Sequence, residues 1–385
     1  MTPLYFDYAA TTPVDERVAA AMMSCLTLDG TFGNPASRSH KLGWQAEQQV
    51  ENARRQLADC IGADPRELVF TSGATESNNL ALKGAVEALR QSEPHAPVHL
   101  ITSRIEHKAV LDVCAWLEKS GMEVSYLTPD ADGLITPGQV QEALRPHTRL
   151  VSLMAVNNEL GTLTDIAKIG ALLRPLGVLL HVDAAQAIGK IPVDVRAWQV
   201  DLLSISAHKF YGPKGIGALY VRREPQVKIA CQMHGGGHER GMRSGTLPTH
   251  QLVGMGLAAE LVRQHLAQEM AHYQMLNARL WQGLSALSGV HLNGHAQQRT
   301  GNHLNISIEG VDGEILLASL AKIALSSGSA CNSATVAPSY VLKALGRSDA
   351  LAHAGLRFSL GRFSTAEQVD AAVAEVVRVV QLLRR

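Results

Sequence analysis

Short apolar runs alternate with amphipathic stretches through about the first 225 residues of the chain. The runs are rich in Val, Ile and Leu and are continuous rather than alternating in polarity, which is typical of parallel strands buried on both faces. Seven of these runs predict strands, at residues 67–71, 98–102, 123–127, 150–156, 178–182, 202–205 and 218–221. The amphipathic stretches predict helices, at residues 16–28, 42–61, 77–90, 107–120, 137–144 and 165–173. This order predicts βαβ units and a mostly parallel sheet.

The pattern changes after Thr246. Residues 251–287 form one long helical pattern, and a predicted strand at 304–308 and predicted helices at 312–322 and 366–383 follow it. We therefore predict an α/β protein in which a larger domain with a mostly parallel central sheet is joined to a smaller α+β domain. The larger domain is expected to comprise residues 16–263, and the smaller one residues 1–15 with residues 264–385.

Composition narrows the function classes. The 385 residues are 46% hydrophobic and 18% charged, the opposite of a disordered chain. Lys+Arg and Asp+Glu both number 35, so no overall positive charge attracts a polyanion and we expect no direct nucleic-acid binding. The sequence has no run of 18 apolar residues and no recognisable signal peptide, so we expect a cytoplasmic protein that does not enter a membrane.

Neither a metal nor a disulfide framework is expected. The five cysteines include no C-x-x-C pair, and their spacings are wide. His234 and His238 are four residues apart, but the three glycines between them predict a loop rather than a metal-binding helix. Composition alone does not show whether any one of the five cysteines has a chemical role.

The segment 70–79, Phe-Thr-Ser-Gly-Ala-Thr-Glu-Ser-Asn-Asn, joins a predicted strand to a predicted helix through a turn of small residues. The free N–H groups and the positive dipole end at the start of a helix bind phosphate well. Ordinary capping of the helix by Ser or Thr explains the same residues equally well. The segment alone therefore leaves a phosphate site and a simple helix cap open.

Two further strands end in side chains that suit one cofactor. Asp183 follows the strand at 178–182, at the edge where open α/β sheets bind ligands, although a helix-capping Asp is the simpler explanation when it is taken alone. Lys209 follows the strand at 202–205 and could be a surface lysine, but a lysine removed from water is a nucleophile that can form a Schiff base. A lysine, a carboxylate for a ring nitrogen and a phosphate site are together what pyridoxal 5′-phosphate requires.

Five segments resemble those of cysteine desulfurases: Thr71-Ser-Gly-Ala-Thr-Glu-Ser-Asn, His181-Val-Asp-Ala-Ala-Gln, Ser206-Ala-His-Lys, Arg243-Ser-Gly-Thr and Ser327-Gly-Ser-Ala-Cys. The resemblance runs from Tyr5 to Arg362, nearly the whole chain. Within that family, the chain is similar to the housekeeping branch, whose cysteine loop reads Ser-Ser-Gly-Ser-Ala-Cys. The resemblance implies the class V aminotransferase family and fold type I of the pyridoxal-phosphate-dependent transferases.

The resemblance implies roles in cofactor chemistry for four residues. Lys209 is expected to hold the cofactor as a Schiff base and then to move the Cα proton of the substrate. Asp183 is expected to keep the ring nitrogen protonated, and Gln186 to donate to the ring hydroxyl. His107 is expected to lie against the face of the cofactor and to act in acid–base catalysis, with a helix cap or a core position as the alternative.

The same resemblance implies the phosphate site and the oligomeric state. The phosphate is expected at Ala74 and Thr75, with Ser206 and His208 beside it. Thr246 matches a residue that enters the site from a second subunit, which implies a homodimer with shared active sites.

The resemblance also implies a substrate site and a nucleophile. Asn158 and Arg357 match the pair that binds the carboxylate of L-cysteine, since a guanidinium meets a carboxylate through two hydrogen bonds. Asn158 is expected to contact the cofactor as well, and the alternative for Arg357 is a plain surface cation. Cys331 matches the thiol that attacks the substrate sulfur and becomes a persulfide. The other four cysteines are expected to be small buried hydrophobic residues.

The implied activity is conversion of L-cysteine to L-alanine, with sulfur passed to an acceptor protein for iron–sulfur cluster assembly or for thio-modification of tRNA or DNA. Housekeeping members continue past the position of Arg385 with an extension that docks an iron–sulfur scaffold, so the sequence does not identify the acceptor. A selenocysteine lyase or another pyridoxal-phosphate-dependent β-lyase or aminotransferase-like enzyme is the alternative within the same class. A Rossmann-type oxidoreductase would need a glycine fingerprint that is missing, and a non-catalytic sulfur carrier would not need the Lys209, Asp183 and His107 set.

Overall fold

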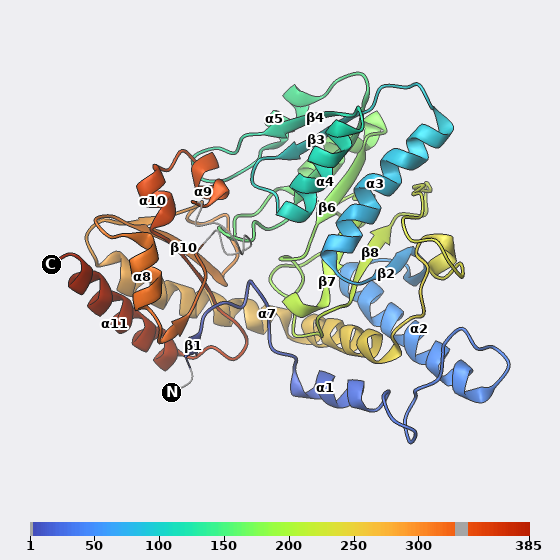
Figure 1. Ribbon diagram of the computed structural model, residues 1–385, viewed down its shortest axis with the longest axis horizontal. Helices are drawn as coiled ribbons and strands as arrows, with labels where there is room; N and C mark the ends of the chain where they lie inside the picture. Colours follow the sequence, from blue (N-terminus) through green and yellow to red (C-terminus); the bar gives the residue numbers. More distant parts are fainter. Residues whose placement is uncertain (1–2, 328–337) are drawn as a thin grey trace.

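The computed structural model describes residues 3–327 and 338–385 of the chain. Its larger lobe is built around a seven-stranded sheet in the order β2-β8-β7-β6-β5-β3-β4 (Figure 1). The strands are β2 (Leu68–Thr71), β3 (His99–Ser103), β4 (Glu123–Leu127), β5 (Thr148–Met154), β6 (Leu179–Asp183), β7 (Leu202–Ser206) and β8 (Gly217–Val221). Within this sheet β8 runs antiparallel to β2 and β7, and the other pairs are parallel. The predicted α/β architecture is confirmed, and all seven predicted strands form.

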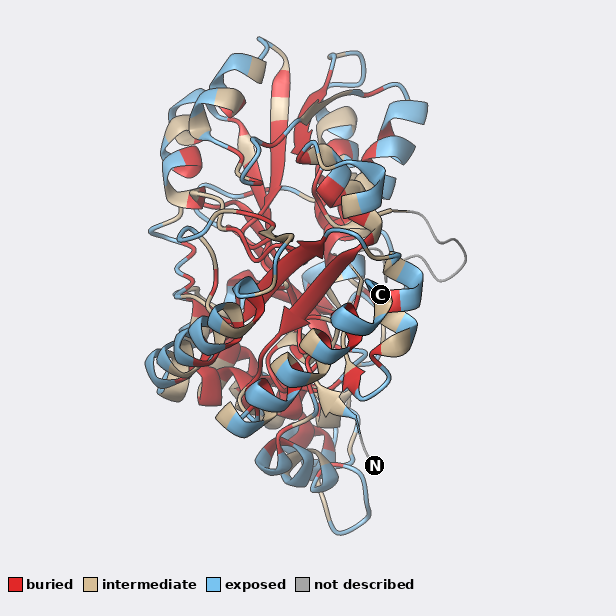
Figure 2. Cartoon of the chain, turned by 90° about the vertical axis from the view of Figure 1, so that its left-hand side faces the viewer, coloured by how far each residue is buried: buried red, intermediate tan, exposed pale blue. Residues whose placement is uncertain are grey.

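Helices cover both faces of this sheet. Neighbouring residues of a strand point to opposite faces, so the sheet packs against helices on both sides. The helices are α1 (Glu16–Met23), α2 (Lys41–Ile61), α3 (Ala74–Ser92), α4 (Lys108–Lys119), α5 (Pro137–Ala143), α6 (Ile166–Leu173) and α7 (Thr249–Ser285). Val69 of β2 packs into one core with α3 and α4, whereas Phe70 packs into another with α2, α6 and the first half of α7. Figure 2 shows the buried strands between helices whose outer sides are exposed.

The smaller lobe is an α+β unit, in which an antiparallel sheet of order β12-β10-β9 packs against helices and the second half of α7. Its elements are β9 (Val290–Leu292), β10 (His303–Ile308), α8 (Gly313–Ser319), α9 (Tyr340–Ala344), α10 (Asp349–His353), β12 (Gly355–Ser359) and α11 (Ala366–Leu383). Strand β1 (Leu4–Tyr5) pairs in parallel with β11 (Ile323–Ala324). The start of the described chain therefore lies in this lobe.

Helix α7 connects the two lobes (Figure 1). Its buried residues from 252 to 262 belong to the core of the larger lobe, and those from 273 to 284 belong to the core of the smaller lobe together with Phe6. We therefore propose that the domain division lies at residue 263 and that residues 1–15 return to the smaller domain.

The sequence pattern missed β1, β9, β11, α9, α10 and β12. Strands β1, β9 and β11 have only two or three residues, and helices α9 and α10 have five residues each, less than two helical turns, so none of them shows a clear periodic pattern. The helix predicted at 16–28 ends at Met23, and the one predicted at 312–322 ends at Ser319. Within the described part of the chain, no helix has the length and hydrophobicity of a membrane span.

Candidate active site

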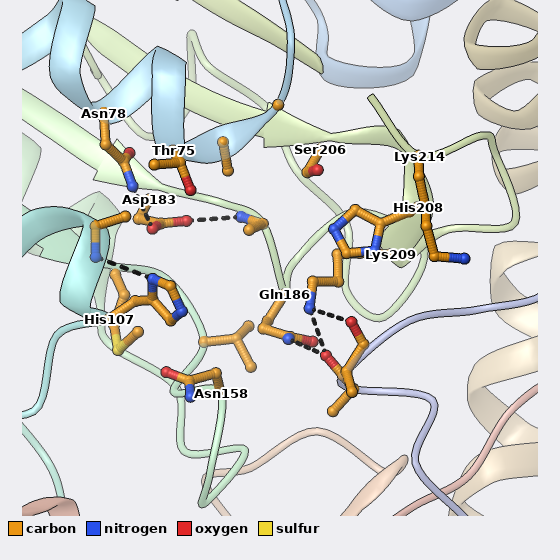
Figure 3. A pocket seen from close by; sticks show the side chains of 18 of the residues that line it. Thr75, Asn78, His107, Asn158, Asp183, Gln186, Ser206, His208, Lys209 and Lys214 are labelled. Carbon is orange, nitrogen blue, oxygen red and sulfur yellow. Dashed lines mark hydrogen bonds between the residues drawn. The ribbon is translucent and has the colours of Figure 1, made fainter. Parts of the chain in front are cut away.

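A cavity of about 500 Å³ opens where the carboxyl ends of β6 and β7 meet the start of α3 (Figure 3). Open α/β sheets bind ligands at this edge. Ten of the predicted site residues line the cavity: Ala74, Thr75, His107, Asn158, Asp183, Gln186, Ser206, His208, Lys209 and Arg357. Asp7 and Ser326 of the smaller lobe line it as well, so both lobes contribute to its walls.

The start of α3 faces this cavity without a side-chain cap. Its N-cap is Gly73, so the alternative of ordinary capping by Ser or Thr is wrong. Gly73 has φ 149°, a backbone conformation that favours glycine. A Cβ atom added there would lie 3.5 Å from Oγ of Ser206, at the end of β7. The N–H groups at Ala74 and Thr75 and the Ser206 hydroxyl are thus close together, an arrangement suited to a phosphate.

His208 lines the same cavity as this helix start. Its Nδ1 is 3.1 Å from Oγ1 of Thr11, and its backbone carbonyl accepts a hydrogen bond from the N–H of Thr12 (2.9 Å). Burial lowers the pKa of His208 to about 4, and the positive charges of Lys209 and Lys214 add to this effect. The imidazole is therefore neutral at neutral pH and contributes hydrogen bonds rather than charge.

Asp183, the last residue of β6, is 5% exposed and lines the cavity. Its Oδ2 accepts a hydrogen bond from Nδ2 of Asn78 (2.8 Å), and its Oδ1 accepts one from the N–H of Ala185 (2.9 Å). The second bond closes a turn, because residues 185–190 form turns and not a helix, so the alternative of a helix-capping Asp is wrong. The sequence interpretation assigned Asn78 no role, although its position one turn after Thr75 places it on the same side of α3.

Lys209 ends a short 3-10 turn (Ala207–Lys209) after β7 and reaches the cavity half-buried. Its Nζ donates to the backbone carbonyls of Ala9 (2.6 Å) and Ala10 (2.8 Å). Gln186 donates from Nε2 to the same carbonyl of Ala9 (2.8 Å). Figure 3 shows both side chains directed at this N-terminal segment, which therefore holds them in the cavity.

His107 is the N-cap of α4, and the same side chain lines the cavity. Its Nδ1 accepts a hydrogen bond from the N–H of Ala109 (3.1 Å). Burial lowers the pKa of His107, so the ring is neutral at neutral pH. Since Nδ1 is an acceptor, the single ring proton resides on Nε2. His107 therefore combines the helix cap, which was the alternative, with a position in the cavity.

Arg357, in β12, is 4% exposed, so the alternative of a surface cation is wrong. Its Nη1 donates to the carbonyl of Asn158 (2.8 Å), and its Nη2 donates to Oδ1 of Asp7 (2.8 Å). These bonds fix the plane of the guanidinium, while its buried Nε has no partner among the described residues. The sequence interpretation assigned no role to Asp7, because the contact forms only when β12 is folded against the N-terminal segment.

Two of the predicted site residues are not among the residues that line this cavity. Thr246 is exposed and lies outside it, and Cys331 lies outside the described residues. None of the four described cysteines lines the cavity: Cys25, Cys60, Cys114 and Cys231. Across residues 3–327 and 338–385, no group of three or more His, Cys, Asp or Glu side chains is placed to hold a metal ion.

Comparison with known proteins identifies the family. A model of the aminotransferase class-V family matches residues 4–372. Cysteine desulfurase IscS of Aeromonas salmonicida is 59% identical over 96% of this chain and 91% of the relative. The chain belongs to the cysteine desulfurases of the class V aminotransferase family. Cysteine desulfurase IscS of Photobacterium profundum is 56% identical over 99% of this desulfurase and 94% of the relative, so the resemblance to the housekeeping branch is confirmed.

Solved structures place the desulfurase in the expected fold. A NifS-like protein has a TM-score of 0.91 at 35% identity, covering 99% of this chain and 100% of the other. SspA in complex with cysteine has a TM-score of 0.82 at 39% identity, covering 94% and 99%. DndA from Streptomyces lividans has a TM-score of 0.77 at 42% identity, covering 92% and 99%. Fold type I is therefore confirmed.

Cysteine desulfurases depend on pyridoxal 5′-phosphate, and the cavity fits this cofactor. Oε1 of Gln186 and Oδ1 of Asn158 are buried side-chain oxygens without a partner among the described residues, and both residues line the cavity. The uncapped start of α3 suits the phosphate, and the buried carboxylate of Asp183 suits a ring nitrogen. The cofactor predicted for this desulfurase is confirmed.

Proposed function

We propose that this desulfurase converts L-cysteine to L-alanine and keeps the sulfur as a persulfide on Cys331 before an acceptor protein takes it. The observation that carries the proposal is the shared cavity, which is lined by Lys209, Asp183 and the uncapped start of α3. A sulfur carrier without catalysis would need none of these three. The similar structure of SspA contains cysteine, which supports the same substrate here.

Groups from three elements would hold the cofactor. The N–H groups at Ala74 and Thr75, with the hydroxyl of Ser206, would bind its phosphate. Asp183, oriented by Asn78, would keep a proton on the ring nitrogen. When bound, the cofactor supplies an electron sink that stabilises negative charge on the substrate Cα. Gln186 would hydrogen-bond to the ring hydroxyl, and neutral His208 would lie beside the phosphate.

Lys209 and His107 would handle protons in the same cavity. Nζ of Lys209 would take the proton from the substrate Cα and return a proton to the product. Nε2 of His107, which carries the ring proton, would donate a hydrogen bond across the face of the cavity. Asn158 and the oriented guanidinium of Arg357 would bind the substrate carboxylate, which fixes the Cα within reach of the lysine.

Cys331 would act as the nucleophile toward sulfur. Its thiolate would form a bond to the substrate sulfur while the substrate Cβ–S bond breaks, with the electron pair remaining on carbon. Addition of a proton to that carbon would complete alanine and leave the sulfur on Cys331. We expect the acceptor to be a cytoplasmic protein that serves iron–sulfur cluster assembly or thio-modification of tRNA or DNA.

The position of Thr246 supports a homodimer. This residue is exposed and outside its own cavity, so in a dimer it would be free to enter the cavity of a second copy. Large apolar side chains in the segment between α1 and α2 and in the first turn of α2 are also exposed, with Leu28 at 84%, Phe32 at 45% and Trp44 at 55%. Removing such side chains from water would stabilise an interface between two copies.

Turnover of the purified holoenzyme tests the proposed function. L-Cysteine with dithiothreitol is expected to yield alanine and sulfide in equal amounts, measured by mass spectrometry and by sulfide assay. Selenocysteine is the comparison substrate, since a selenocysteine lyase would form alanine from it at least about tenfold faster than from cysteine. Pyruvate and ammonia in place of alanine would instead indicate a β-lyase, and no turnover of either substrate would refute the proposal.

Arg357→Lys is expected to raise the KM for L-cysteine by about 10- to 100-fold, with a smaller change in kcat. Lysine keeps the charge but not the planar fork that Asn158 and Asp7 hold in place. Steady-state alanine formation over a range of cysteine concentrations measures both constants. Arg347→Lys is the control, because Arg347 also holds a backbone carbonyl in the smaller lobe but does not line the cavity. Equal KM values in the two variants would contradict the role of Arg357.

A further inference from the structure

A second lysine is buried behind Lys209. Lys190 is 3% exposed and lies in the turn that follows Gln186. Its Nζ donates to the backbone carbonyl of Lys209 (2.8 Å) and, more weakly, to that of Ile188 (3.5 Å). Both partners are neutral, and no carboxylate of the described residues forms an ion pair with this amine.

Burial of an ammonium group without a carboxylate partner is unfavourable. Burial lowers the pKa of Lys190 to about 8, the charges of Lys209 and Arg362 add to the lowering, and Glu269 opposes it. At neutral pH the amine is still mostly protonated. A methionine or leucine would fill the same space at a smaller cost, so the amine supplies something that an apolar side chain does not.

We propose that Lys190 is a positioning residue for Lys209: its amine fixes the Lys209 peptide group, and its positive charge opposes a second positive charge on the Lys209 side chain. The inference rests on the proposed role of Lys209 as the cofactor-bearing lysine. The bond from Lys190 restrains the backbone from which the reactive side chain departs, and the carbonyls of Ala9 and Ala10 hold the other end of that side chain. Lys209 is therefore held at both ends.

The backbone after Lys209 shows the same restraint. Tyr211, two residues later, has φ 69°, which is uncommon for a residue other than glycine and persists only where the surroundings impose it. Its N–H donates to Oγ1 of Thr12 (2.7 Å), and its carbonyl accepts from the N–H of Asp15 (3.1 Å). The turn that presents Lys209 is thus fixed by the N-terminal segment on one side and by Lys190 on the other.

Four titratable or charged groups interact with Lys190 through their charges. They are Lys209, Glu269 of α7, Arg362 after β12 and His303 of β10. Glu269 is already engaged, because it accepts from Nε of Arg362 (2.7 Å) and from the hydroxyl of Tyr273 (2.9 Å). Burial lowers the pKa of His303 far below its usual value, so this ring is neutral. Glu269 therefore acts on Lys190 only at a distance and forms no ion pair with it, and the charges of Lys190 and Lys209 act on each other.

The experiment uses the enzyme loaded with pyridoxal 5′-phosphate and three substitutions that separate the two effects. Lys190→Met removes the donor and the charge, Lys190→Gln keeps a donor without the charge, and Lys190→Arg keeps both. Arg222→Met is the matched control, because it removes a buried cation of the same lobe that pairs with Asp201 (2.6 Å) and does not line the cavity. The readouts are the pH midpoint of the visible absorption band, cofactor retention on dialysis, and kcat and KM for alanine formation.

Lys190→Met is expected to raise the pH midpoint by about one unit, because a nearby cation favours the neutral form of a cationic group and its removal favours the protonated form. It should also lower kcat about tenfold with little change in KM. Lys190→Gln should show the same shift in midpoint but recover part of the kcat, whereas Lys190→Arg and Arg222→Met should keep the wild-type midpoint.

A folded Lys190→Met enzyme with the wild-type midpoint and kcat would overturn the inference, and if that variant does not fold, the midpoint of Lys190→Gln decides. An equal shift in Arg222→Met would also overturn it, since the effect would then be general destabilisation. Failure of the proposed function is recognised separately, because the wild-type enzyme itself would then lack the visible band or form no alanine.

Discussion

Lys209→Ala is expected to abolish the visible absorption band of the holoenzyme and to lower alanine formation from L-cysteine by about 10⁴-fold. The substitution removes the amine that would hold the cofactor covalently and that would also move the Cα proton, and each of these contributions is large. The fold should survive, because Lys209 is half-buried at an open cavity and its amine bonds to two backbone carbonyls that water can satisfy. Absorption spectra after incubation with pyridoxal 5′-phosphate and dialysis, together with alanine analysis, measure both effects.

Lys214→Ala is the matched control for this result. Lys214 is another lysine that lines the same cavity, and it lies beside His208 in Figure 3. Its removal should leave the visible band in place, whatever its effect on cofactor affinity. A band that persists in Lys209→Ala and disappears in Lys214→Ala would reassign the cofactor lysine.

Strands such as β7 and β8, which are buried at every residue, could be predicted from sequence because burial on both faces favours a nearly continuous apolar run. Strand β12 shows where this approach fails. Its sequence, Gly-Leu-Arg-Phe-Ser, is interrupted by Arg357, and a local pattern with an arginine at its centre does not indicate a fully buried strand. The arginine is accommodated because Asn158 and Asp7, far away in the sequence, accept its hydrogen bonds. No local rule conveys that compensation.

The residues of the candidate site also fall into those that the sequence predicted and those that it missed. Asp183 and Lys209 could be predicted because they directly follow apolar runs, and the ends of parallel strands meet at one edge of a sheet. Their supporting groups could not, since Asn78 appears as one polar residue among several on an amphipathic helix. Lys190 appears in the sequence as an ordinary lysine between Gly189 and Ile191, and its burial becomes evident only when the segment is packed against Lys209.

Cys331→Ser is expected to lower sulfide release from L-cysteine by at least about 10³-fold while the visible absorption band of the holoenzyme remains. A serine hydroxyl is not ionised at neutral pH and does not form a stable bond to sulfur, so the step that accepts the substrate sulfur is lost. The four described thiols are poor substitutes, because none of them lines the cavity. Burial raises the pKa of Cys60 and of Cys114 to about 12, and Cys231 donates through Sγ to the carbonyl of Met233 (2.9 Å), away from the cavity.

Cys231→Ser is the matched control, because Cys231 is a partly exposed thiol in a loop of the larger lobe. It should keep wild-type sulfide release and should still gain one sulfur atom on Cys331 when the enzyme reacts with cysteine without a reductant, as detected by mass spectrometry of the peptide. The Cys331→Ser enzyme should carry no such additional sulfur on any cysteine. Since the lysine, carboxylate and phosphate-binding groups are unchanged in both variants, a loss confined to Cys331→Ser would separate sulfur acceptance from cofactor binding. Sulfide release at the wild-type rate by Cys331→Ser would instead mean that sulfur leaves the cavity without a thiol of the protein.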